Sequence, residues 1–145
     1  MWNRRGVTLL EVLLSIAILG ILGAGTTSAI LRFHGKSDLD FAVTMGASSL
    51  RRAEELSRAV SSDQTWGVKF ATGTITVFRG ASYALRDSSV DEATAIGPDI
   101  YASGADEYVF TKVYATTTAA TTTLVHNVLG ESRMIMVNAK GTIDY

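Results

Sequence analysis

The chain has 145 residues, of which 47% are apolar and 19% charged, and its formal net charge at neutral pH is −1. This length suits one modest domain plus an anchor. The near-neutral charge gives no general reason to expect a nucleic-acid partner. The absence of cysteine excludes a disulfide framework, a thiolate metal site and a cysteine nucleophile.

The N-terminal segment combines a short polar leader with a long apolar run. Residues 1–6 include the adjacent cations Arg4 and Arg5, and residues 7–25 are apolar apart from two hydroxyl side chains and Glu11. As a helix this run would be about 28 Å long, close to the hydrocarbon thickness of a bilayer. The cations would keep the leader in the cytoplasm by the positive-inside rule. The rest of the chain would then lie across the membrane.

Glu11 is the feature of this run that needs an explanation. A carboxylate costs about 3 kcal/mol near the centre of a bilayer, so it requires a partner. Cleavage between Gly6 and Val7 would make Glu11 the fifth residue of the product and would free a positively charged amine on Val7. Between staggered helices, this amine and the Glu11 carboxylate of a neighbouring subunit would neutralise each other and fix the axial register.

Residues 5–12, with the sequence RGVTLLEV, resemble the cleavage and methylation signature of type IV prepilins and type II secretion pseudopilins. The resemblance implies that a prepilin peptidase cuts after Gly6, that the new amine of Val7 is methylated, and that Glu11 serves assembly. The chain departs from many major pilins by having Val7 in place of phenylalanine, Ser28 in place of a helix-kinking proline, and no C-terminal cysteine pair. These departures favour a minor pilin or a pseudopilin.

Three other interpretations of the N-terminal segment are open. It could be a cleavable secretory signal with a small-residue cut site near residues 23–25 or 27–29, an ordinary uncleaved signal anchor, or a buried core helix. Each of the three leaves the carboxylate of Glu11 unexplained.

Residues 38–60 show an amphipathic helical pattern that predicts an extension of the anchor helix, docked on a head domain. His34-Gly35-Lys36 is a predicted weak point or bend between the two halves. Arginines at positions 51, 52 and 58 could suggest a nucleic-acid patch, but the interspersed Glu54 and Glu55 favour a solvated helix face.

Residues 61–145 predict a β-rich head. The threonine-rich tract 115–123 suits either an exposed loop or a solvent-facing strand and turn, and the second interpretation is favoured. Residues 87–99 are predicted to be connecting structure. Strands are predicted at 66–70 and 74–78 with a turn at Gly73, then at 82–86, 108–114, 124–128, 133–137 and 141–145, the last two joined through Ala139-Lys140.

The predicted fold class is therefore α+β, with a long N-terminal helix packed on an antiparallel β-sheet head. The helix has a transmembrane half and an amphipathic half. The predicted divisions are a leader at 1–6, a transmembrane and filament-core helix at 7–31, an amphipathic extension at 32–60 and a head at 61–145. Trp66-Gly67-Val68 and the closing hairpin at 138–141 are also similar to the H-type minor pseudopilins.

The sequence offers no positive evidence for an enzyme, a metal site or a cofactor. His34 and His126 lie far apart without ligand-spaced partners, so each is expected to be a surface or packing residue. Loop carboxylates could gather around Ca²⁺, as in some pseudopilin heads, but without calcium-loop spacing solvated carboxylates are favoured. These carboxylates are Asp87, Asp91, Glu92, Asp99, Asp106 and Glu107.

The function that the resemblance implies is that of a structural subunit of a type IV pilus or a type II secretion pseudopilus, of the minor kind. Its expected partners are other subunits, the prepilin peptidase, an inner-membrane assembly platform and, before assembly, membrane lipid. The subunit would span the inner membrane once, with its head outside the cytoplasm, and then enter a periplasmic or extracellular filament.

Two alternatives stay open. A minor pilin that binds DNA for uptake would have a basic stripe on its head and would lose DNA binding as salt rises. A surface binding domain on an ordinary signal anchor would tolerate the replacement of Glu11 by leucine.

Overall fold

A computed structural model describes residues 6–145, except for the side chains of residues 24–32. Residues 1–5, and with them most of the predicted leader, lie outside the described residues. The chain divides into two compact units, one that ends at His34 and one that comprises Gly35–Tyr145. Each unit is described by itself below.

One helix, α1 (Leu9–Arg58), supplies all the α-helix of the described chain. It begins after Thr8, whose hydroxyl accepts a hydrogen bond from the backbone N–H of Glu11 at 3.3 Å. The helix is continuous through residues 34–36, where we predicted a weak point or bend, and the boundary between the two compact units falls at this place.

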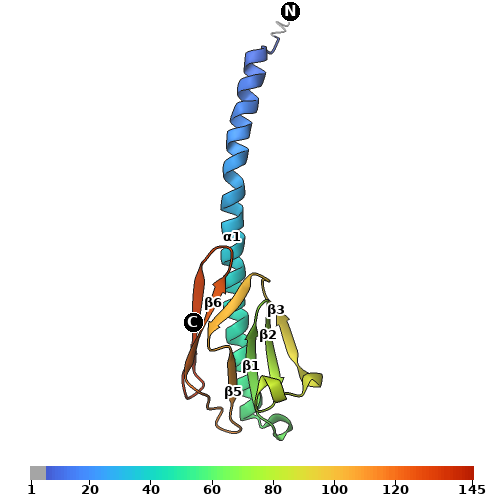
Figure 1. The fold of residues 1–145 in the computed structure, drawn as a ribbon, viewed down its shortest axis with the longest axis vertical. Coiled ribbons are helices and arrows are strands. Elements are labelled where there is room, and N and C mark those ends of the chain that lie inside the picture. Colours follow the sequence, from blue (N-terminus) through green and yellow to red (C-terminus); the bar gives the residue numbers. More distant parts are fainter. Residues whose placement is uncertain (1–5) are drawn as a thin grey trace, which may run out of the picture. The chain divides into compact units, whose positions relative to one another are not determined.

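The second unit contains two four-stranded antiparallel sheets around the C-terminal part of α1 (Figure 1). The first sheet has the order β3-β2-β1-β5, and the second has the order β4-β6-β7-β8. Short 3₁₀ turns at Ser61–Asp63, Tyr83–Leu85 and Ser88–Val90 connect parts of the head. The strands are β1 (Trp66–Ala71), β2 (Thr74–Arg79), β3 (Glu92–Ala95), β4 (Ile100–Gly104), β5 (Glu107–Phe110), β6 (Ala120–His126), β7 (Ser132–Val137) and β8 (Ile143–Asp144).

The α+β class and the first hairpin are confirmed. β1 and β2 pair antiparallel from Trp66 opposite Arg79 to Ala71 opposite Thr74. The turn between them contains Gly73 at a φ of 72°, a conformation that glycine adopts without the steric cost that a Cβ would add. The antiparallel head is divided into two sheets, which the sequence analysis did not distinguish.

The strand predicted at residues 82–86 is wrong. Ser82 accepts a hydrogen bond from the backbone N–H of Leu85 and caps a 3₁₀ turn at Tyr83–Leu85. Arg86 then folds back, with its guanidinium 3.7 Å from the centre of the Tyr83 ring and an ion pair to Asp91 at 2.7 Å. These local bonds compete with a strand ladder.

The prediction of connecting structure for residues 87–99 is wrong in part, because this stretch contains β3. β3 is an edge strand whose backbone pairs with β2, from Thr74 opposite Ala95 to Val77 opposite Glu92. None of its side chains is fully buried. Its strand conformation therefore depends on its partner and not on an apolar pattern of its own.

The threonine-rich tract ends in a strand, because β6 begins at Ala120, but this strand is not simply solvent-facing as the favoured interpretation predicted. Thr122 is fully buried in that strand, and its hydroxyl bonds that of Tyr108 at 2.9 Å. β5 ends at Phe110, four residues before the predicted end of its strand at 114. The intervening residues form a tight loop that is considered below.

The core of the head lies where α1 meets both sheets. Leu39, Leu50 and Ala53 on the helix are fully buried. At Gly46 the helix approaches both sheets closely, because a Cβ built on this residue would lie 2.8 Å from Ile135 Cδ1 of β7 and 2.9 Å from Phe70 Cε1 of β1. One glycine thus allows a strand from each sheet to pack against the same turn of the helix.

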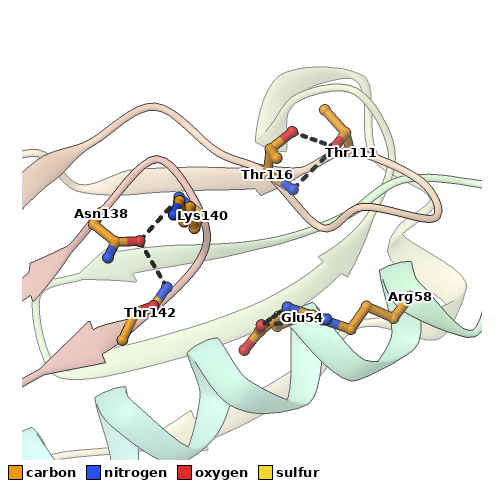
Figure 2. A network of polar contacts seen from close by, with 7 residues as sticks. All are labelled: Glu54, Arg58, Thr111, Thr116, Asn138, Lys140 and Thr142. Carbon is orange, nitrogen blue, oxygen red and sulfur yellow. Dashed lines mark hydrogen bonds and ion pairs between the residues drawn. The ribbon is translucent and has the colours of Figure 1, made fainter.

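The closing hairpin is confirmed at the position that the sequence indicated. The side-chain oxygen of Asn138 accepts hydrogen bonds from the backbone N–H groups of Lys140 and Thr142, both at 2.9 Å (Figure 2). Gly141 completes the turn at a φ of 86°. The turn returns the chain so that β8 pairs with the end of β7, with Val137 opposite Ile143.

Candidate processing and assembly site

The predicted cleavage point, Gly6-Val7, lies before the first turn of α1. The structure places Val7 outside the helix, with 71% of its surface exposed. No heavy atom lies within 4 Å of a Cβ built on Gly6. The bond between these two residues therefore lies outside the helix in exposed chain, where a peptidase could reach it.

Thr8 and Glu11 form the N-terminal cap of the helix. The Glu11 N–H donates to the Thr8 hydroxyl at 3.3 Å and to the Thr8 carbonyl oxygen at 3.1 Å. Glu11 is therefore the third residue of the helix, in the position that a glutamate takes in a Thr-x-x-Glu capping box. Our sequence analysis missed this role of Thr8, although the spacing of Thr8 and Glu11 carried the signal.

The position of Glu11 has an electrostatic consequence. Its side chain is exposed and lies in the first turn, where the unpaired N–H groups of the helix favour a negative charge. A free amine on Val7 would put a positive charge at the same helix end, which the helix dipole disfavours. A carboxylate one turn away, on the same helix or on a neighbouring one, offsets that cost.

The surface of the helix around Glu11 is apolar except on the side that carries Thr8, Glu11 and Ser15. Every residue from 6 to 23 is exposed, and Glu11 is the only charged residue among them. A helix with so much exposed apolar surface is stable when lipid or protein covers it. The large apolar side chains that are exposed here are those of Val7, Leu9, Leu10, Val12, Leu13, Leu14, Ile16, Ile18, Leu19, Ile21 and Leu22.

In the part of the chain that the structure describes, no helix has an apolar stretch long enough to cross a membrane. The predicted anchor, residues 7–31, includes positions 24–31, whose side chains lie outside the described residues.

Five of the six carboxylates that could have gathered around a cation form ion pairs with basic side chains. Asp87 contacts Arg79, and the carboxylate of Glu92 lies 3.4 Å from Arg52. Asp106 and Glu107 share Lys69, at 2.7 Å and 3.8 Å. Residues 6–145, with the gap in side chains at 24–32, contain no group of three or more carboxylates and histidines suited to a metal ion.

The charged face of α1 is solvated, as predicted. Arg51 and Arg52 are exposed, and Arg58 pairs with Glu54 one turn earlier at 2.7 Å.

The two histidines differ in their exposure. His34 is exposed, whereas His126 on β6 is 8% exposed and packs near Gly35, with its Nε2 atom 3.0 Å from a Cβ built on that glycine.

Comparison with known proteins identifies the N-terminal segment. Residues 3–27 match the family model of the prokaryotic N-terminal methylation motif. This match contains Gly6, Val7 and Glu11. Neither a curated protein nor a solved structure matches the chain. With an accessible Gly6-Val7 bond, a capped helix end at Glu11 and this match, the chain carries the N-terminal methylation signal of type IV pilins and pseudopilins.

Proposed function

We propose that this protein is a minor structural subunit of a type IV pilus or a type II secretion pseudopilus. A prepilin peptidase cuts after Gly6, the amine of Val7 is methylated, and the subunit waits in the inner membrane with its head outside the cytoplasm. An assembly platform then moves it into a filament, where α1 segments of neighbouring subunits replace lipid around residues 7–31.

One observation carries this proposal: an exposed apolar helix end with a single charge. Residues 7–23 expose apolar side chains at every position except Thr8, Glu11, Ser15 and two glycines, and they begin with a capped turn that holds Glu11. An ordinary anchor needs the apolar surface, but it gains only a helix cap from the carboxylate, which is costly to bury in lipid. A filament subunit needs both, because neighbouring helices cover the surface and the amine of Val7 neutralises the carboxylate.

Processing is tested by the intact mass and N-terminal sequence of the protein from cells that contain a prepilin peptidase. We expect a chain that starts at Val7 and carries one added methyl group on its amine. A chain that starts at Met1, or after Gly25 or Ala29, would contradict the proposal and leave the head as an anchored or secreted domain.

The role of Glu11 in assembly is tested by two substitutions that separate its charge from its capping geometry. Glu11→Gln keeps a side chain suited to the capping box but removes the charge, whereas Glu11→Leu removes both. If the charge pairs with the amine of Val7, both variants are cleaved yet neither enters filaments that are sheared from cells. Normal incorporation of Glu11→Gln would assign Glu11 to capping alone.

A further inference from the structure

The turn between β6 and β7 has an unusual composition for its place on the surface. It consists of residues 127–130, with the sequence NVLG, and we call it the β6–β7 turn. Turns generally carry glycine, proline or short polar residues, because these suit the tight backbone and keep contact with water. Here the two central residues are Val128 and Leu129, and none of the four is charged. The apolar centre of this turn therefore needs an explanation.

The packing of the turn on α1 explains one of the two side chains. A Cβ built on Gly35 of α1 would collide with Leu129 Cδ1 and would lie 3.0 Å from Nε2 of His126. Because Gly35 has no side chain, the β6–β7 turn can lie directly against the helix backbone. Val128 has no such place in the head, since 72% of its surface is exposed.

Two ion pairs hold the same hairpin on α1. The Lys36 ammonium lies 3.4 Å from a carboxylate oxygen of Glu131, and the Arg133 guanidinium donates to the carboxylate of Asp40 at 3.2 Å. In each pair one residue belongs to the helix and the other to the chain that follows the turn, and the two charges balance. The β6–β7 turn is therefore held at the start of the head without a net charge from these four residues.

The place of Gly35 in the sequence keeps this turn close to the membrane. In the proposed function lipid covers residues 7–31, and Arg32 is the first charged residue after Glu11. The four residue steps from Leu31 to Gly35 span at most about 14 Å, whatever conformation they adopt. While the anchor is in lipid, Gly35 and the turn that packs on it therefore stay near the membrane surface.

The opposite end of the head is charged. Lys112 and Asp63 form an ion pair at 2.9 Å there, and the N–H of the neighbouring Val113 donates to the carbonyl oxygen of Ser57 at 3.1 Å. Along α1, Ser57 lies about 33 Å from Gly35. A head whose Gly35 end rests on lipid thus keeps this charged end in water.

We propose that the β6–β7 turn rests on the membrane surface while the subunit is anchored, with Val128 inserted at the boundary between lipid headgroups and acyl chains. Apolar side chains favour that boundary, and the turn has no charge that would lose its water there. The apolar area is small, so the contact is reversible and breaks when the subunit enters a filament. The inference rests on the proposed function and deepens it, because it gives the head a lipid partner before assembly.

Quenching by labelled lipid tests this contact, because the natural chain has no cysteine and one fluorophore can be attached at a chosen position. Full chains with Asn127→Cys, Val113→Cys or Leu19→Cys carry the fluorophore in phosphatidylcholine vesicles, in which part of the lipid has a nitroxide quencher on an acyl chain. Asn127 is exposed and adjoins Val128 without replacing it. Leu19 reports the insertion of the anchor, and the exposed Val113 is the control at the charged end of the head.

We expect the quencher to lower the fluorescence at positions 19 and 127 by about half or more, and to change it at position 113 by less than about a tenth. Val128→Asp added to Asn127→Cys should remove most of the quenching at position 127, because a carboxylate disfavours the apolar boundary. The Val128→Asp chain should unfold at the same urea concentration as its parent, since this side chain is exposed.

Two results would overturn the inference. The first is quenching at position 19 together with no more quenching at position 127 than at position 113. The second is quenching at position 127 that survives Val128→Asp. In both cases the label at position 19 still reports an anchor in lipid, so the proposed function stands. A label at position 19 that the lipid does not quench would contradict the membrane stage of the proposed function, and the inference would fall with it.

Discussion

Ser57 ties the end of α1 to the first sheet. It is fully buried, and its hydroxyl donates to the carbonyl oxygen of Phe110 at 3.3 Å while it accepts from the Trp66 N–H at 3.2 Å. Its carbonyl oxygen accepts a hydrogen bond from the Val113 N–H in the loop of residues 111–116. Ser57 therefore joins the helix to β1 and β5 through its side chain and to this loop through its backbone.

The Ser57→Ala substitution should lower the free energy of unfolding by about 1–3 kcal/mol, because it leaves buried backbone groups without their partner. Urea unfolding of the full chain in detergent, followed by tryptophan fluorescence, measures this change. Ser48→Ala is the matched control, since Ser48 is exposed on the same helix and should change stability by less than about 0.5 kcal/mol. Equal effects of the two substitutions would contradict this role of Ser57.

Asp87 makes part of the stability of the head depend on pH. Hydrogen bonds from Ser89, together with the guanidinium of Arg79, lower the pKa of Asp87 from its ordinary value of 3.8 to about 2. A carboxyl group whose pKa is lower in the folded state stabilises the fold above its unfolded pKa, and that contribution is lost as pH falls toward the folded pKa. The loss should therefore occur between pH 3.8 and about 2.

The Asp87→Asn chain should lose less stability than the natural chain over this pH interval, because its side chain cannot be protonated. The measurement is the urea midpoint at a series of pH values. Asp99→Asn, at an exposed position, serves as the control and should follow the natural chain. If Asp87→Asn also followed the natural chain, the pH dependence would have to come from other carboxylates.

The candidate site was accessible to sequence analysis at the residue scale because its chemistry is local. Gly6, Val7 and Glu11 occupy one short segment, and their spacing alone indicates a cut, a new amine and a carboxylate. The loop of residues 111–116 was not accessible to sequence analysis in the same way. Val113 is a residue typical of strands, and in the structure it has a positive φ and donates its N–H to the carbonyl oxygen of Ser57, a residue that only the fold brings close.

At the scale of elements, the sequence predicted strands well where they carry buried apolar residues of their own. β1, β2 and β7 were all predicted: β1 and β2 consist mostly of buried residues, and buried and exposed residues alternate in the second half of β7. β3 was missed because its side chains are largely exposed and its conformation comes from pairing with β2. β4 was missed as well, and it pairs with β6, which lies about twenty residues later along the chain.

Gly46 controls how closely the helix packs on both sheets. Gly46→Ala should destabilise the head by about 1–3 kcal/mol, since the new methyl group would overlap Ile135 and Phe70. This cost should exceed the gain of about 1 kcal/mol in helix propensity. The measurement is the urea midpoint of the full chain in detergent.

The control for this prediction is Gly20→Ala, at another glycine of the same helix, where a new Cβ would meet nothing within 4 Å. It should leave the unfolding midpoint of the head unchanged. A Gly46→Ala chain as stable as the natural one would show that the side chains of Ile135 and Phe70 can shift without cost.

At the scale of the whole molecule, the head should fold without the apolar segment. The buried hydrophobic cluster lies entirely between Leu39 and Val137, inside the unit Gly35–Tyr145. A fragment of residues 35–145 should therefore be soluble without detergent and should unfold at the same urea concentration as the full chain. A fragment that aggregates or lacks a cooperative transition would show that residues before 35 contribute to the core.

The contacts of α1 also determine how the head responds to mechanical load. A pull along the helix axis reaches the first sheet through Phe70 and Ser57 and the second sheet through Ile135, so both sheets share the tension. Side chains that interlock along a helix all resist sliding at the same time. Strands that are peeled from the edge of a sheet, in contrast, separate one pair of residues at a time. Force applied at the N-terminal end of α1 would thus shear the whole core at once, and the head would be strongest in the direction in which its helix is pulled.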